Sequence, residues 1–246
     1  MTYLQFHLVF ILPPLAVLLG MALRRGLPAG AWKALLWTTL IALIYTTPWD
    51  NYLVYASVWV YGPERVLGTI GYVPLEEYLF FLLQPLLTGL FYLLFFAATP
   101  PGDRNGGPGV VAVMLALAAA GAGMLLWGAE KWTYLGLILA WACPVLAGMW
   151  FYGGGYFGTR WRAMWLAALL PSVYLWIADR IAIGLGIWTI AESTSTGIML
   201  LGLPVEEATF FLLTDLLVVS GVSLFLHGAH IAAHRQTPAQ ETSSLT

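Results

Sequence analysis

The chain has little charge, one cysteine and two lysines, and each shortage excludes a class of protein. Charged residues make up 9% of the 246 residues, and the net charge of −2 comes without a basic patch, so no nucleic-acid partner is expected. Cys143 is the only cysteine, which excludes an intrachain disulfide and a thiolate metal cluster. Lys33 and Lys131 lie at the ends of apolar runs, so the last run holds no lysine for a retinal Schiff base.

Apolar residues are abundant instead, at 60% of the chain with a mean hydropathy of +0.82. A helix needs about 20 apolar residues to cross a bilayer. The sequence therefore predicts an all-α integral membrane protein with seven transmembrane helices, at residues 3–23, 31–47, 74–98, 110–128, 134–152, 161–178 and 204–226. Residues 54–71 and 181–202 are too polar or broken to span. They carry Trp59, Tyr61 and Trp188, which suits segments that lie at the membrane interface.

The basic residues predict the orientation of these spans in a cell membrane. Seven of the ten fall on one side, namely Arg24, Arg25, Lys33, Arg104, Arg160, Arg162 and Arg235. The other side carries Arg65, Lys131 and Arg180. Because basic residues are enriched in cytoplasmic loops, we expect a multi-pass protein with its N-terminus outside and its C-terminus in the cytoplasm.

A motif occurs twice, 130 residues apart, as Pro74-Leu75-Glu76-Glu77 and Pro204-Val205-Glu206-Glu207. Other residues repeat at nearly the same offset, including Thr2-Tyr3-Leu4 with Thr133-Tyr134-Leu135, Asp50 with Asp179, and Trp59 with Trp188. Spans one to three therefore correspond to spans five to seven, and span four links them. Repeats that begin four spans apart point the same way across the membrane. The predicted divisions are residues 1–98 (first repeat), 99–130 (loop and linking span), 131–230 (second repeat) and 231–246 (polar tail).

The paired glutamates are the main candidates for chemistry. A charged side chain at the bilayer centre costs about 2.5–3.5 kcal/mol, and capping of a helix N-terminus is the alternative explanation for acids in a first turn. Glu77 shares a helix face with Gln84, and Glu207 shares one with Asp215, whereas Glu76 lies over Phe80. We therefore expect Glu77 and Glu207 to point into the bundle, with Glu76 and Glu206 as further catalytic candidates.

Converging carboxylates in a low-dielectric site cannot all ionise, so a general acid can stand beside a general base. Aromatic faces nearby can stabilise a cation, and the candidates are Phe80, Phe81, Phe210, Phe211, Trp59 and Trp188. Asp50, Asn51 and Asp179 are expected at the same level, either to orient the glutamates or to close the bundle. Asp215 is the deepest acid, and a functional role and a single interhelical hydrogen bond are equally good explanations for it. Acid, base and aromatic wall suit protonation of an alkene, rearrangement of the cation and loss of a proton.

The duplicated Pro-x-Glu-Glu with its following Phe-Phe, preceded by Pro48-Trp49-Asp50-Asn51-Tyr52, resembles the membrane lycopene cyclases of bacterial heterodimeric, archaeal and fungal type. The resemblance covers nearly all of the chain except the tail and matches the fused, single-chain form. It implies a lycopene β-cyclase that converts linear carotenoid end groups to β-ionone rings, with the motif glutamates as acid and base. Some members of the family cyclise C50 carotenoids, and this alternative stays open.

The remaining calls concern cofactors, metals and partners. Gly153, Gly155 and Gly158 spell G-x-G-x-x-G, but no β-strand precedes them, so we predict a loop end and no flavin site. No metal site is predicted either, because a helix tail at the interface explains the pair His230 and His234. The expected partners are lycopene from the lipid phase, membrane lipids and, as an open possibility, further copies of the chain. A small carrier or transporter with intramembrane acids is the alternative from another class.

Overall fold

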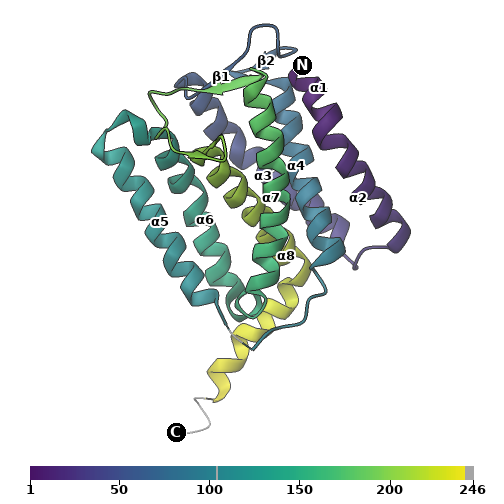
Figure 1. Ribbon diagram of the computed structural model, residues 1–246. Helices are drawn as coiled ribbons and strands as arrows, with labels where there is room; N and C mark the ends of the chain where they lie inside the picture. The colour runs from purple at the N-terminus through teal and green to yellow at the C-terminus, as the bar shows by residue number, and fades with distance from the viewer. Residues whose placement is uncertain (104, 242–246) are drawn as a thin grey trace.

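The computed structural model describes residues 1–103 and 105–241, without the side chains of residues 229, 230 and 232–241. Among the described residues, seven long helical segments lie side by side in one bundle (Figure 1). Arg104 and the side chains of His230, His234 and Arg235, on which sequence predictions were based, lie outside this description.

The helices have the following bounds. The first segment combines α1 (Tyr3–Phe6), a π-helical turn η1 (His7–Ile11) and α2 (Leu12–Arg25). The others are α3 (Ala31–Tyr55), α4 (Leu75–Phe95), α5 (Gly107–Trp127), α6 (Thr133–Gly158, preceded by the 3-10 turn η2, Glu130–Trp132), α7 (Trp161–Gly184) and α8 (Val205–Glu241).

Six of the seven predicted spans are confirmed, within the described residues, as helices long and apolar enough to cross a membrane. Residues 31–55 are the exception: α3 has 25 residues, or about 37 Å, but several threonines, Asp50 and Asn51 lower its hydropathy.

Several predicted helix ends are wrong, because buried polar residues, prolines and glycines do not end these helices. α3 continues through Pro48 to Tyr55, and α7 continues to Gly184, so Asp50 and Asp179 lie inside helices and not at their ends. Neighbouring helices can compensate for the one backbone hydrogen bond that a proline removes. The predicted glycine loop belongs to α6, which kinks at Gly154 (φ 47°, ψ −129°). At the start of α4, Pro74 is the N-cap and not part of the first turn.

Short strands cover the end of the bundle near the N-terminus. The strand β1 (Trp59–Tyr61) pairs antiparallel with β4 (Trp188–Ile190), which joins the two segments that were predicted to lie along the interface (Figure 1). Two-residue hairpins, β2–β3 (Thr69–Ile70, Val73–Pro74) and β5–β6 (Met199–Leu200, Leu203–Pro204), lead directly into α4 and α8. The side chains of Trp59 and Trp188 are 6% and 8% exposed, so they form part of the core and not an interfacial belt.

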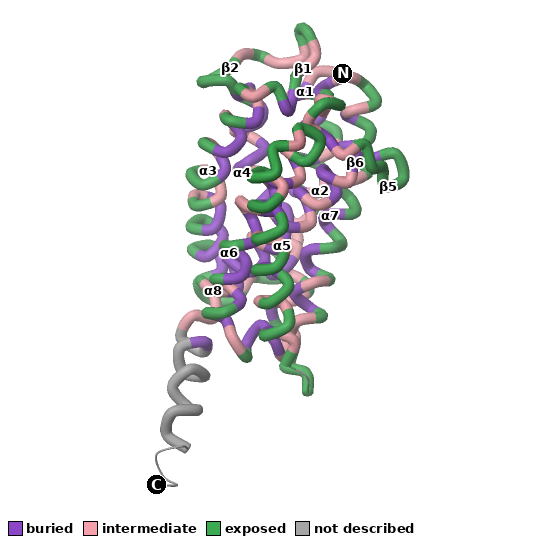
Figure 2. The backbone as a smooth tube through the Cα atoms, turned by 90° about the vertical axis from the view of Figure 1, so that its left-hand side faces the viewer, coloured by how far each residue is buried: buried purple, intermediate pink, exposed green. Residues whose placement is uncertain are grey.

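The core lies around α8, which packs against α3, α4, α6 and α7. α5 packs mainly on α6, where Gly121 and Gly136 allow close approach of the two backbones, and exposed residues follow its outer side (Figure 2). The central position of α8 and α4 brings their N-terminal turns, with both glutamate pairs, under the strand cover.

Candidate active site

A small buried cavity, which we call the acid chamber, lies under β1 and β4 and contains Glu77 of α4 and Glu207 of α8 in its wall. Its volume is about 20 Å³, enough for about one water molecule. Both residues are almost fully buried, at 4% and 1% exposure. The remaining lining residues are Tyr3, Phe6, Trp59, Phe80, Leu175, Asp179, Trp188, Phe210 and Phe211.

Each of these two glutamates accepts a hydrogen bond from a tyrosine of a distant helix. The Tyr3 hydroxyl donates to Glu77 Oε2 at 2.6 Å, and the Tyr134 hydroxyl donates to Glu207 Oε1 at 2.6 Å. Glu77 Oε2 accepts a second bond, from the hydroxyl of Tyr61, at 3.1 Å. Short hydrogen bonds of this kind hold each carboxyl group in a defined orientation.

The sequence analysis missed these three tyrosines as site residues. Tyr3 and Tyr134 were visible only as matching members of the repeat, and their contacts with the acids span 74 and 73 residues of sequence. Tyr61 lies in β1, outside the membrane-spanning helices. Burial raises the pKa of its phenol well above the usual range, and the neighbouring Glu77 raises it further, so Tyr61 acts as a neutral donor.

The other two motif glutamates, Glu76 and Glu206, are buried but face away from the acid chamber. Glu76 Oε1 accepts the backbone N–H of Leu67 at 2.9 Å. Glu206 Oε1 accepts both the backbone N–H and the hydroxyl of Thr196, each at 2.7 Å. These bonds attach the connecting segments to the starts of α4 and α8.

Asp50 and Asp179 are both 1% exposed, but only Asp179 lines the chamber. Asp179 Oδ1 accepts the indole N–H of Trp188 at 2.8 Å. Neither carboxyl oxygen of Asp50 has a hydrogen-bond partner among the described residues. Asn51 lies away from the chamber, where its side chain bonds the backbone of Thr47 and of Tyr72. Asn51 therefore holds the β2–β3 hairpin and does not orient a glutamate.

Asp215 lies about two helical turns below Glu207 and is fully buried. Its Oδ1 accepts the hydroxyl of Thr88 at 2.6 Å and the side-chain amide of Gln84, and its Oδ2 accepts the hydroxyl of Ser172 at 2.8 Å. Three donors from α4 and α7 satisfy this carboxyl group. Asp215 therefore forms a polar junction between the helices and does not line the chamber.

The four phenylalanines that follow the glutamate motifs line two neighbouring cavities. Phe211 lines the acid chamber, Phe81 lines a larger neighbouring groove, and Phe80 and Phe210 line both. The Phe80 and Phe211 rings meet edge to face at 6.2 Å, and Trp59 meets Phe210 in the same way at 6.0 Å. The chamber thus offers ring faces around two carboxyl groups. Within residues 1–103 and 105–241, as far as the structure describes their side chains, no group of three or more metal-ligating side chains is present.

Fold and site define a helical membrane protein with a buried chamber of carboxyl, phenol and aromatic groups. The family model described as lycopene cyclase matches residues 1–95 and 131–225 of the chain. The chain therefore belongs to the lycopene cyclase family, and the resemblance predicted from the motifs is confirmed.

Curated relatives agree with this assignment. A protein of Halobacterium salinarum (strain ATCC 29341 / DSM 671 / R1) named lycopene beta-cyclase is 42% identical over 234 residues, which cover 91% of this chain and 95% of the relative. A bifunctional lycopene cyclase/phytoene synthase of Phycomyces blakesleeanus is 37% identical over 95% of this chain, which spans 40% of that longer protein. No solved structure matches the chain.

Proposed function

We propose that this protein is a lycopene β-cyclase, which closes the linear end groups of lycopene into β-ionone rings by acid–base catalysis. The observation that carries the proposal is the placement of Glu77 and Glu207 in the wall of one aromatic chamber, in a chain 42% identical to a protein named lycopene beta-cyclase. Two carboxyl groups in one dry chamber are costly to ionise together. One therefore keeps its proton and can act as the acid, and the other is available as the base.

The reaction proceeds in three steps. The protonated glutamate adds H⁺ to C2 of the terminal C1=C2 bond and leaves a tertiary cation at C1. The C5=C6 double bond attacks C1, which closes the ring and moves the cation to C5. The carboxylate then removes the proton from C6, giving the C5=C6 bond of the β ring. The ring faces of Phe80, Phe210 and Trp59 stabilise the intermediate cations.

The hydrogen bonds support one division of the two roles. Glu77 accepts two phenolic bonds through one oxygen, whereas Glu207 accepts one. A carboxylate is favoured by the larger number of donors. Glu207 is accordingly the acid, and Glu77 is the base. One proton enters and one leaves per ring, so the reaction consumes no redox equivalents, and we propose that it needs no redox cofactor.

The proposal includes seven membrane spans in two parallel repeats, with α3 as a full span and α5 as the link. The two segments that the family model matches start and end 130 residues apart (131 − 1 and 225 − 95), the offset of the glutamate motifs, which supports a duplication. The count of basic residues supports an external N-terminus and a cytoplasmic C-terminus. In that arrangement both glutamates lie near the outer face, and the substrate arrives from the lipid.

Expression in a lycopene-accumulating bacterium tests the function. Extracted pigments should include products of unchanged mass and shorter-wavelength absorption, because the C5=C6 bond in the new ring is twisted out of the plane of the polyene. Glu77→Gln and Glu207→Gln should each abolish these products, whereas Glu130→Gln, at an exposed position in η2, should not. Full activity in either chamber variant would overturn the assignment, and unchanged lycopene with wild-type protein in the membrane would favour a C50 substrate or a carrier.

A further inference from the structure

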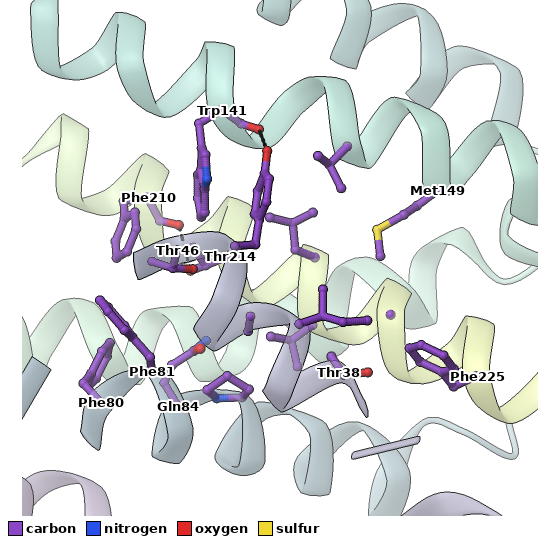
Figure 3. Close-up of a pocket in the computed structure, with 18 residues that line it drawn as sticks. Thr38, Thr46, Phe80, Phe81, Gln84, Trp141, Met149, Phe210, Thr214 and Phe225 are labelled. Carbon is purple, nitrogen blue, oxygen red and sulfur yellow. Dashed lines mark hydrogen bonds between the residues drawn. The ribbon is translucent and has the colours of Figure 1, made fainter. Parts of the chain in front are cut away.

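A second cavity, which we call the lateral groove, adjoins the acid chamber. It runs between α3 and α6 over a floor of α4 and α8, from Trp141 and Phe210 at one end to Met149 and Phe225 at the other (Figure 3). Its volume is about 170 Å³, compared with about 20 Å³ for the acid chamber. Phe80 and Phe210 line both cavities, so their rings form the partition between groove and chamber.

The groove follows the bundle axis and opens sideways. Its lining positions on α8 extend from residue 210 to residue 225, which corresponds to about 22 Å of helix. The hydrocarbon core of a bilayer is about 30 Å thick, so the groove extends through most of this depth. Ile41, Tyr45 and Phe225 in its lining are 51%, 39% and 49% exposed, so its lip faces the surroundings of the bundle, which are lipid in a membrane. Near the chamber, the Tyr45 hydroxyl bridges α3 and α6 by donating to the Trp141 carbonyl at 3.0 Å.

The wall of the groove suits a hydrocarbon chain. Aliphatic and aromatic side chains predominate, and the hydroxyl of Thr214 is used by the backbone carbonyls of Phe210 and Phe211 at 2.9 and 3.0 Å. A long, thin, apolar molecule fits such a slot, whereas a polar headgroup would find few partners there.

On the opposite side of the bundle, the corresponding slot does not reach the chamber. Its lining comes from α2, α4 and α7, and it shares no lining residue with the acid chamber. Tyr174, which corresponds to Tyr45, bridges two helices in the same manner by donating to the Phe10 carbonyl at 2.6 Å. Phe91 lines this slot at the position that corresponds to Gly221 in the groove (221 − 91 = 130). A Cβ on Gly221 would approach the Thr38 methyl to 3.1 Å, so the absence of a side chain at this position leaves space in the groove.

We infer that the lateral groove binds the conjugated chain of a linear carotenoid, whose end group reaches the acid chamber by displacing the rings of Phe80 and Phe210. The inference rests on the proposed cyclase function, because the chamber is where the end group reacts. The chamber holds about one water molecule and cannot accept an end group unless these rings turn. The groove therefore fixes the position of the chain, and the opposite slot plays no part in the reaction.

Binding is measured separately from turnover by working in the Glu77→Gln background, in which lycopene is not consumed. Lycopene is achiral, so a visible circular dichroism band appears only for molecules held in chiral surroundings. The protein in lipid nanodiscs is titrated with lycopene, with and without two substitutions that fill the groove, Gly221→Phe on the floor and Ala42→Phe near the lip. Val17→Phe, which fills the opposite slot at a position 63% exposed, is the matched control.

We expect a saturable band in the Glu77→Gln parent and in the Val17→Phe control. Each groove substitution should raise the half-saturating lycopene concentration about tenfold or more, because a phenylalanine ring displaces a stretch of the polyene and its many van der Waals contacts. With Glu77 restored, the same substitutions should raise KM and change kcat less. Equal half-saturation in all four proteins would overturn the groove assignment and leave an acyl chain as its occupant. Ala42 is partly exposed, so its variant decides the question if Gly221→Phe fails to fold. The proposed function fails separately, if wild-type protein forms no cyclic product or if the Glu77→Gln parent still does.

Discussion

The phenol–carboxyl contacts predict that Tyr134→Phe is more damaging to catalysis than Tyr3→Phe. Tyr134 is the one hydroxyl seen to bond the Glu207 carboxyl group among the described residues, at 2.6 Å, and its ring is fully buried. Glu77 has two such donors, so removal of the Tyr3 hydroxyl leaves the Tyr61 bond at 3.1 Å. The exchange of tyrosine for phenylalanine keeps the ring and deletes only the donor, so packing of the helices is retained.

The expected size follows from the bond that is lost. A hydrogen bond to a charged or proton-transferring group contributes about 1.5–3 kcal/mol, which corresponds to a decrease in kcat of about 10- to 100-fold for Tyr134→Phe. Tyr3→Phe should lose less than about tenfold, and the double variant Tyr3→Phe/Tyr61→Phe should approach the Tyr134→Phe value. KM should change little, because the phenols act on the acids and not on the polyene chain.

The assay is the initial rate of ring formation by purified protein in lipid, quantified by chromatography. Tyr52→Phe on α3, at a position 51% exposed, is the control and should retain wild-type kcat. The reasoning is refuted if Tyr134→Phe keeps a kcat within about twofold of the wild type, or if Tyr3→Phe alone loses as much as Tyr134→Phe, since the shared acceptor Glu77 would then have no second donor of consequence.

Two further substitutions test stability through thermal unfolding of the purified protein. Asp215→Leu should lower the free energy of unfolding by about 1–3 kcal/mol, because it leaves three buried donors without their acceptor. Asp215→Asn keeps one oxygen acceptor and should lower it less. Equal Tm values for the two variants would contradict the polar junction. Gly154→Ala should lower the free energy of unfolding by about 1–2 kcal/mol. The cause is backbone strain at φ 47° and not a steric clash, because no atom stands within 4 Å of the added methyl group. Gly155→Ala in the same helix should be neutral or stabilising, and the reverse order of the two Tm values would disprove the kink.

Apolar runs predicted most of the helices, because membrane spans need long uninterrupted hydrophobic segments. The ends of α3 and α7 were wrong for a related reason: polar residues such as Asp50 and Asp179 signal an exit from the membrane in sequence, but here they are buried by neighbouring helices. Nothing local in residues 59–61 and 188–190 indicates that they pair, as their strands are more than 120 residues apart. Pairing of that kind depends on how the two halves of the bundle meet.

For the site, helical spacing was enough to select Glu77 and Glu207 as the inward members of their pairs. Residues seven and eight apart share a face, and the structure places these two in the chamber wall. Spacing could not show what the outward members do, because the bonds of Glu76 and Glu206 go to the backbone and side chains of the connecting segments. The roles proposed for all four remain predictions until the substitutions are made.

The two halves of the chain differ at the buried acid that does not line the chamber, Asp215. Asp215 and Thr88 tie α8 to α4, and Ser172 joins them from α7, one of the helices that line the opposite slot. At the corresponding positions on the groove side stand Pro85 and Val218 (215 − 85 = 130; 218 − 88 = 130), and both line the groove. Neither can form a side-chain hydrogen bond. The second repeat therefore places a polar side chain where the first has Pro85, and the first places Thr88 where the second has Val218, so apolar side chains stand at these positions in the wall of the cavity that shares Phe80 and Phe210 with the acid chamber.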